Sequence, residues 1–87
     1  MIRSEVKTTS YFDEQVLRKR PYIDPAWIAP ILAAPLKRIV QDDGRIRLWG
    51  EVVDGRDGKT RFLRVVMLPD GETVHNAFFD RDFEAPP

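Results

Sequence analysis

The stretch DGRIRLWGEVV (Asp43–Val53) decides the fold class of this 87-residue chain. Its first two residues, Asp-Gly, favour a tight turn between antiparallel strands. Every second residue from Ile46 to Val52 is apolar or glycine, which is the period of a strand with one buried face. The preceding LKRIVQ (Leu36–Gln41) has the same period, so the two segments predict a β-hairpin.

Two more strands are expected further along the chain. The polar loop DGRDGK (Asp54–Lys59) leads into RFLRVVML (Arg61–Leu68), and Pro69–Gly71 turns the chain into ETVHNAFF (Glu72–Phe79). Because each connection is short, neighbouring strands pair antiparallel, and the sheet predicted is a four-stranded meander.

The segment before the sheet predicts two helices. Ser10 is a suitable N-cap for the first helix, which would end before Pro21. Asp24 and Pro25 are an N-cap and a first-turn proline, and this second helix would end at Pro35. The fold class expected is α+β, with two N-terminal helices packed on one face of the four-stranded antiparallel sheet.

The length of 87 residues predicts a single domain spanning residues 1–87. Residues 1–8 show no clear periodicity and would form a loose arm or a short edge strand. The tail at 84–87 (EAPP) would fray.

Two-residue loops at both Asp-Gly turns give the strand register. The expected pairs are Ile39 with Leu48, Leu48 with Val65, and Met67 with Val74. The face covered by the helices would hold Ile39, Ile46, Leu48, Gly50, Val52, Leu63, Val65, Met67, Val74 and Phe78, with Gln41 and Asn76 as polar exceptions. The open face would hold Arg38, Val40, Arg45, Arg47, Trp49, Glu51, Phe62, Arg64, Val66, Thr73, His75, Ala77 and Phe79. A three-residue loop at 69–71 is the alternative, and a one-residue slip at either turn would exchange the faces beyond it.

Composition excludes several kinds of site. The chain has no cysteine and one histidine, which excludes disulfides, thiolate metal sites and typical zinc sites. We therefore expect no metal and no cofactor. The longest low-charge run, Pro25–Leu36, is too short and too rich in proline to span a bilayer. A cytoplasmic protein without membrane contact is expected.

The charges are balanced overall but unevenly distributed. Formal net charge is zero, which argues against a simple polyanion binder. Residues 1–50 carry nine Lys/Arg and six Asp/Glu, and residues 51–87 carry five and eight. Ten of the 14 basic residues are arginine, which suits bidentate contacts with phosphate or carboxylate. The simplest alternative is that these arginines pair with a matching number of acids on a small surface.

On the expected register, five polar or aromatic side chains share the open face: Arg47, Trp49, Glu51, Arg64 and His75. They contain the parts needed to cleave RNA without a metal. Glu51 or His75 would act as base and the other as acid, Arg47 and Arg64 would hold the phosphate, and Trp49 would stack a base. Further nucleic-acid contacts are expected from Arg38, Arg18, Lys19 and Arg20.

The same residues also fit a solvated sheet face without a ligand. Arg64 could pack on Trp49 as a cation–π pair, and Glu51 could pair with Arg38 or Arg61. The basic run Arg18–Arg20 suits the negative end of the first helix dipole. Whether the protein is an enzyme stays open at this point.

A basic helix, a short helix beginning Asp-Pro, and the strands DGRIRLWGEV and RFLRVV…ETVHNAFFDR resemble the RelE/BrnT-like toxin superfamily of small bacterial domains. The resemblance covers residues 10–82. A small bacterial family sharing DGRIRLWG and GETVHNAFFDR is also similar. The resemblance implies helices before a curved antiparallel sheet, RNA cleavage without metal, and neutralisation by an antitoxin protein. It would make Arg47, Arg64 and His75 phosphate-handling residues, with Lys19 or Arg20 supplied by the first helix.

Two functions follow as expectations. The first is a toxin-like, metal-independent ribonuclease or RNA-binding domain. The second is a non-catalytic interaction module, whose open sheet face docks a partner protein or a second copy through Phe62, Val66, Ala77 and Phe79. A relative that keeps the fold and has lost the site is a third possibility.

Overall fold

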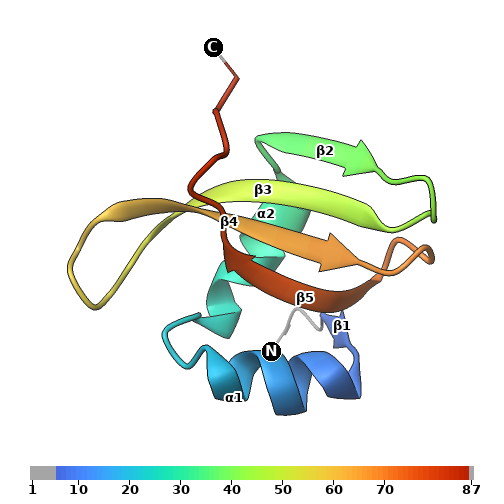
Figure 1. Cartoon of the computed structure of the whole chain (residues 1–87), viewed down its shortest axis with the longest axis horizontal. Coiled ribbons are helices and arrows are strands. Elements are labelled where there is room, and N and C mark those ends of the chain that lie inside the picture. Colours follow the sequence, from blue (N-terminus) through green and yellow to red (C-terminus); the bar gives the residue numbers. More distant parts are fainter. Residues whose placement is uncertain (1–5, 87) are drawn as a thin grey trace, which may run out of the picture.

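The computed structural model describes residues 6–86. It is an α+β structure with a five-stranded mixed sheet, in the order β1-β5-β4-β3-β2 (Figure 1). The strands are β1 (Lys7–Thr8), β2 (Lys37–Val40), β3 (Ile46–Val53), β4 (Thr60–Met67) and β5 (Thr73–Phe79). Strands β2 to β5 form the predicted antiparallel meander, whereas β1 runs parallel to β5.

The fifth strand corrects the predicted four-stranded sheet. Lys7–Thr8 forms the short edge strand that was one of two expectations for residues 1–8, and residues 1–5 lie outside the described residues. A strand of two residues is too short to show the alternation of apolar and polar residues by which strands are predicted. Its pairing depends on the distant Thr73 and Val74, which no local pattern can reveal.

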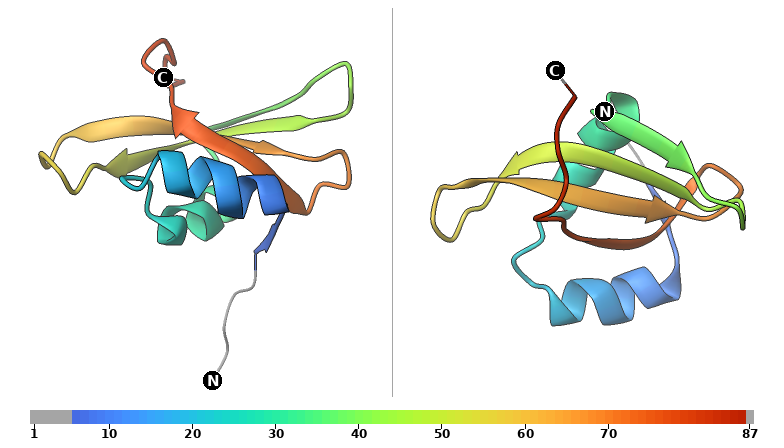
Figure 2. Two further views of the ribbon diagram at one scale, coloured as in Figure 1. Left: turned by 60° about the horizontal axis from the view of Figure 1, so that its bottom comes forward. Right: turned by 45° about the horizontal axis from the view of Figure 1, so that its top comes forward.

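Both helical segments lie on one face of the sheet (Figure 2). The first is a π-helical stretch, η1 (Phe12–Val16), that continues into α1 (Leu17–Lys19). The second is a 3₁₀ turn, η2 (Pro25–Trp27), that continues into α2 (Ile28–Ala33).

The structure confirms one predicted helix cap and corrects the other. Asp24 caps the second helical segment as predicted, because its Oδ1 accepts a hydrogen bond from the Ala26 N–H at 2.9 Å. Ser10 was predicted to cap the first and is already helical. The cap is Thr9, whose Oγ1 accepts from the Phe12 N–H at 3.0 Å. Adjacent Thr and Ser are chemically equivalent caps, so the sequence could not separate them.

The core lies between the helices and the covered sheet face. Its fully or almost fully buried members are Phe12, Val16, Ile23, Ile28, Ile31, Leu48, Leu63, Val65, Val74 and Ala77. Strand β3 passes under α2 at Gly50, where a Cβ atom would lie only 2.8 Å from Cδ1 of Ile31. Glycine at this position is therefore what lets α2 approach the sheet.

The register of β2 differs from the predicted one by one residue. The β2–β3 connection is a three-residue loop, Asp42–Gly44, with Gly44 at φ +87°. A glycine in this left-handed region is typical of three-residue hairpin loops. Ile39 therefore lies opposite Arg47, and Arg38 takes the predicted place of Ile39 opposite Leu48. The faces of β2 are exchanged, so Ile39 is exposed on the open side.

The other two predicted pairs are confirmed. Leu48 lies opposite Val65, and Met67 lies opposite Val74. This register also places Trp49 opposite Arg64, as expected.

A β-bulge in β5 changes which residues of this strand face the helices, compared with the prediction. Val66 pairs with Asn76 instead of His75, which has no partner on β4. Val74 and Ala77 are both fully buried, and residues three apart can face one side of a sheet only if one extra residue intervenes. Beyond the bulge the faces exchange: Ala77 and Phe79 turn to the helix side, and Asn76 and Phe78 to the open side.

The chain after β5 crosses the face of the sheet opposite the helices (Figure 2). Asp80 and Phe83 contact the sheet directly, whereas residues 84–86 are exposed. Within residues 6–86, no helix is long and apolar enough to cross a membrane.

Candidate nucleic-acid interface

A hollow of about 800 Å³ lies where the β3–β4 loop, the end of β5 and the segment after α1 meet. Arginine and aromatic residues dominate its lining: Arg20, Arg56, Arg61, Arg81, Tyr22, Phe62, Phe78, Phe79 and Phe83, with Thr60 and Asp80 completing it. We call it the arginine–aromatic cleft. Its residues come from distant parts of the sequence, between Arg20 and Phe83, so only the folded chain brings them together.

Asp54 fixes two of the cleft arginines. Its side chain is fully buried and accepts from Arg56 Nη2 at 2.7 Å, from the Arg56 N–H at 2.9 Å and from Arg61 Nε at 3.0 Å. The hydrogen bonds from the side chain and backbone of Arg56, with the charges of both arginines, lower the pKa of Asp54 to about 2. Arg56 keeps 55% of its side chain exposed, so Asp54 holds it in place and leaves N–H groups available.

Aromatic rings and guanidinium groups are interleaved in the cleft. The guanidinium carbon of Arg56 lies 4.1 Å from the ring centroid of Tyr22, which stacks on Phe79 at 5.5 Å. Arg20 lies 6.0 Å from the ring of Phe78. These cation–π contacts hold the cations against apolar surface. The cleft therefore presents aromatic rings and cationic groups side by side.

The cleft is locally basic in a chain whose formal net charge is zero. Its lining holds four arginines and one carboxylate, Asp80, which Arg64 engages from the neighbouring surface. Arg56 and Arg61 are paired with Asp54, and Arg61 Nη2 also lies 2.6 Å from Asp57 Oδ2. Among residues 6–86, no carboxylate oxygen lies within ion-pair distance of Arg20 or Arg81. These two side chains could therefore receive an external anion.

A second cluster lies beside the cleft on the open face. Asp80 Oδ2 accepts from Trp49 Nε1 at 2.9 Å and from Arg64 Nη2 at 2.9 Å. The hydrogen bond from Trp49 and the contacts with Arg64 lower the pKa of Asp80, against the opposing effect of burial. Phe83 stacks on Trp49 with centroids 5.2 Å apart, so the indole is only 5% exposed.

The structure brings four of the five predicted open-face residues onto one surface. Arg64 lies opposite Trp49, with its guanidinium carbon 5.5 Å from the indole. Arg47 and Glu51 lie two residues before and after Trp49 on the same side of β3. The cation–π pair considered from the sequence is therefore present, and Trp49 is covered rather than free to stack a base.

His75 is separated from this group by the bulge. Its Nδ1 lies 3.0 Å from Thr9 Oγ1, and its ring stacks on Tyr11 with centroids 4.8 Å apart. Arg64 pairs with Phe78, three residues and roughly 10 Å further along β5. The predicted grouping of His75 with Arg64 on the open face is thus wrong, and the contacts of His75 are with Thr9 and Tyr11 at the first helical segment.

The predicted basic contacts separate into different surfaces. Arg20 lines the arginine–aromatic cleft, whereas Arg18 and Lys19 are exposed on α1 outside it. Arg38 lies on the helix side because of the β2 register.

Of the residues that line the cleft, sequence reasoning named only Arg20 as a nucleic-acid contact. The cations and rings it missed include Arg56, Arg61, Arg81 and Phe83, with Asp54 behind the first two. The loop DGRDGK was interpreted as an ordinary polar hairpin connection. An Asp side chain often accepts a hydrogen bond from the backbone N–H two residues later, and Asp54 and Arg56 have this spacing. The tail DRDF has no periodic signal, since it is neither helix nor strand.

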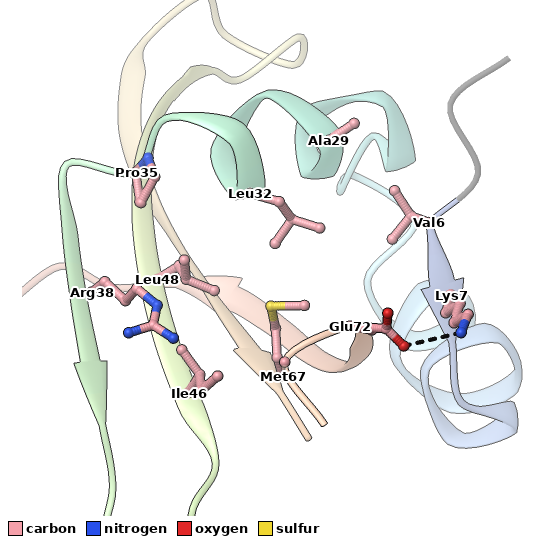
Figure 3. Close-up of a pocket in the computed structure, with 11 residues that line it drawn as sticks. Val6, Lys7, Ala29, Leu32, Pro35, Arg38, Ile46, Leu48, Met67 and Glu72 are labelled. Atoms are coloured by element: carbon pink, nitrogen blue, oxygen red, sulfur yellow. Dashed lines mark hydrogen bonds and ion pairs between the residues drawn. The ribbon is translucent and has the colours of Figure 1, made fainter. Parts of the chain in front are cut away.

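A groove of about 450 Å³ lies on the helix side, between α2 and β1 (Figure 3). Its floor is formed by the core residues Leu48 and Met67, and Arg38 points toward it from β2. At the other end, Lys7 Nζ is paired with Glu72 at 3.0 Å. The groove is mostly a gap in the helical cover of the core.

No group of three metal-ligating side chains was found within residues 6–86. Comparisons with family models, curated proteins and solved structures gave no match to this chain. The resemblance to RelE/BrnT-like domains therefore stays a prediction from the sequence.

Proposed function

We propose that this protein binds single-stranded RNA in the arginine–aromatic cleft. The observation that carries the proposal is the interleaving of arginines with aromatic rings in one hollow of about 800 Å³. Proteins that bind single strands combine cationic groups for the phosphates with aromatic rings for unstacked bases. The cleft supplies both.

Asp54 supports this function by holding Arg56 and Arg61 in place before a ligand arrives. Arginine side chains that are already ordered lose less conformational entropy when they bind phosphate. Arg20 and Arg81 add two cations with no described acidic partner. A balanced net charge is therefore compatible with a basic site, because the acids are concentrated elsewhere or are used as anchors.

The geometry supports binding more directly than cleavage. Metal-independent cleavage needs an acid and a base on either side of one phosphate. His75 is held by Thr9 and Tyr11 near the bulge, while Glu51 is exposed on β3, two strands away. A toxin-like ribonuclease would use the same RNA-binding cleft. It would need an acid and a base other than His75 and Glu51.

Three variants that each remove one positive charge test the proposal, two inside the cleft and one outside it. Arg81→Gln and Arg20→Gln should each weaken binding of a short single-stranded RNA by about tenfold, as expected for losing a hydrogen bond between charged groups. Each should also reduce the salt dependence by about 0.7 in the logarithmic slope. Arg18→Gln removes the same charge outside the cleft and should bind almost like wild type.

Fluorescence anisotropy at several salt concentrations measures both quantities. Equal losses for Arg18→Gln and Arg81→Gln would show that binding depends on overall charge and not on the cleft. Affinity unchanged in all three variants would remove the cleft from the binding site.

A second candidate function, protein interaction, is favoured by the free edge of β2. Leu36, Ile39 and Val40 are 43%, 38% and 55% exposed there. Of the four apolar residues predicted for this role, Phe62 and Val66 lie on the open face, whereas Ala77 and Phe79 turn to the helix side. Sedimentation equilibrium over a concentration series tests self-association. A dimer that Val40→Lys abolishes would support it. A monomer at every concentration would exclude a second copy as the partner.

A further inference from the structure

The tail segment (Asp80–Glu84) lies between two hollows of the surface. On one side lies the arginine–aromatic cleft. On the other lies a hollow of about 480 Å³, whose lining includes Lys37, Arg47 and Arg64. Asp80 and Phe83 line both hollows. Figure 2 shows this part of the chain crossing the sheet opposite the helices. Without the tail segment, the two basic surfaces would meet over Trp49.

The tail segment places on the sheet the same two chemical groups that a nucleotide would bring. The ring of Phe83 lies parallel to the indole of Trp49, with centroids 5.2 Å apart and planes at 11°, as a stacked base would. The carboxylate of Asp80 accepts from Arg64 Nη2 and Trp49 Nε1, both at 2.9 Å, as a phosphate oxygen would.

The charge of the tail segment agrees with this comparison. Asp80, Asp82 and Glu84 are acidic and Arg81 is basic, so the segment has a net charge of −2. It lies beside Lys37, Arg47 and Arg64, which would attract an RNA backbone for the same reason.

We propose that Trp49 and Arg64 form a nucleotide position which the side chains of Asp80 and Phe83 occupy in the free protein, and that single-stranded RNA displaces these two side chains while Arg81 stays in the arginine–aromatic cleft. This inference rests on the proposed function, since RNA held in the cleft would continue across the sheet toward Arg47. A ligand that must displace an internal competitor binds more weakly than one that meets a free site. The tail segment would thus set the affinity of the protein for RNA.

The test uses the full chain and hexauridine as the probe. The indole N–H signal of Trp49 reports the hydrogen bond to Asp80, and Trp27→Phe assigns the two indole signals. In the wild type, hexauridine should move the Trp49 signal as the side chains of Asp80 and Phe83 leave the indole. Phe83→Ala weakens the internal competitor and should bind hexauridine about fivefold more tightly.

Matched variants keep the result interpretable. Phe83→Tyr retains the stacked ring and should bind like wild type, and Asp80→Asn weakens the other anchor and should again tighten binding. The dispersed amide spectrum of each variant confirms that it is folded. Tighter binding by Phe83→Ala and Asp80→Asn, with a moving Trp49 signal, would support displacement.

Two other outcomes separate this inference from the proposed function. If the wild type binds hexauridine while the Trp49 signal stays fixed and Phe83→Ala has the same affinity, displacement is overturned and RNA binding stands. If neither the wild type nor Phe83→Ala binds hexauridine, the proposed function fails and this inference fails with it.

Discussion

Phe83 lies parallel on the indole of Trp49, with ring centroids 5.2 Å apart, on the sheet face opposite the helices. This contact ties the chain after the last strand to the middle of β3, 34 residues earlier. It buries a tryptophan that the sequence predicted to be available for base stacking. The tail segment is therefore part of the folded domain.

Removing the ring of Phe83 should destabilise the fold. Phe83→Ala loses the stacked pair with Trp49 and the edge contact with Phe62, whose centroid lies 5.1 Å away. Because aromatic pairs contribute about 0.5–1.5 kcal/mol beyond their buried area, we expect a loss of about 1–2 kcal/mol in the free energy of unfolding. Urea denaturation measures it. A value equal to that of the wild type would mean that the tail segment does not pack on Trp49 in solution.

The close approach of α2 to β3 makes Gly50 sensitive to any added side chain. Gly50→Ala places a Cβ against Ile31 and should lower the free energy of unfolding by about 1–3 kcal/mol, the usual cost of overpacking. Gly55→Ala is the matched control, since no atom lies within 4 Å of its added Cβ. Denaturation of both variants checks the difference, and equal stabilities would contradict the packing of α2 on Gly50.

The cap of the first helical segment can be tested by comparing the stability of variants at Thr9 and Ser10. Thr9→Ala removes the acceptor for the Phe12 N–H and should cost about 1 kcal/mol of stability. Ser10→Ala should change stability by less than about 0.5 kcal/mol, because its side chain makes no described cap. Thermal denaturation distinguishes them. The reverse order would restore Ser10 as the cap.

The buried carboxylate of Asp54 predicts a specific acid sensitivity. Its pKa is about 2 in the folded protein and near its ordinary value of 3.8 when unfolded. A lowered pKa stabilises the folded state above the unfolded pKa, and this contribution is lost as the pH falls from about 4 toward 2. Asp54→Asn should therefore be less stable than wild type at pH 6, with the difference narrowing below pH 4.

Urea denaturation at a series of pH values follows this narrowing. A constant difference between Asp54→Asn and wild type from pH 6 to pH 2.5 would contradict an ionised Asp54 anchor. The arginines it holds line the cleft, so the same variant should also weaken RNA binding.

Local patterns predicted the elements of the fold but only part of the register. The alternation in β3 and β4 fixed the pair Leu48–Val65, because apolar residues must meet on one face. The β2 register failed because Asp42-Asp43-Gly44 can close a two- or three-residue loop. The bulge at His75 was invisible to a strict two-residue period, although the spacing of Val74 and Ala77 is its consequence.

The candidate site was harder to predict than the fold. Trp49 and Arg64 were brought together as expected, since cross-strand pairing follows from the register. The arginine–aromatic cleft joins residues from the segment after α1, the β3–β4 loop, two strands and the tail segment, and no single stretch shows that combination. His75 drew attention as the sole histidine, yet its chemistry depends on neighbours that the bulge changed.

The most direct test of RNA binding in the arginine–aromatic cleft is an NMR titration with a short single-stranded RNA that follows the arginine side-chain Nε–H signals. We expect the signals of Arg20, Arg56, Arg61 and Arg81 to move together, with those of Arg18 and Arg45 unchanged. Movement confined to residues outside the cleft, or no movement at a large excess of RNA, would contradict the proposed function.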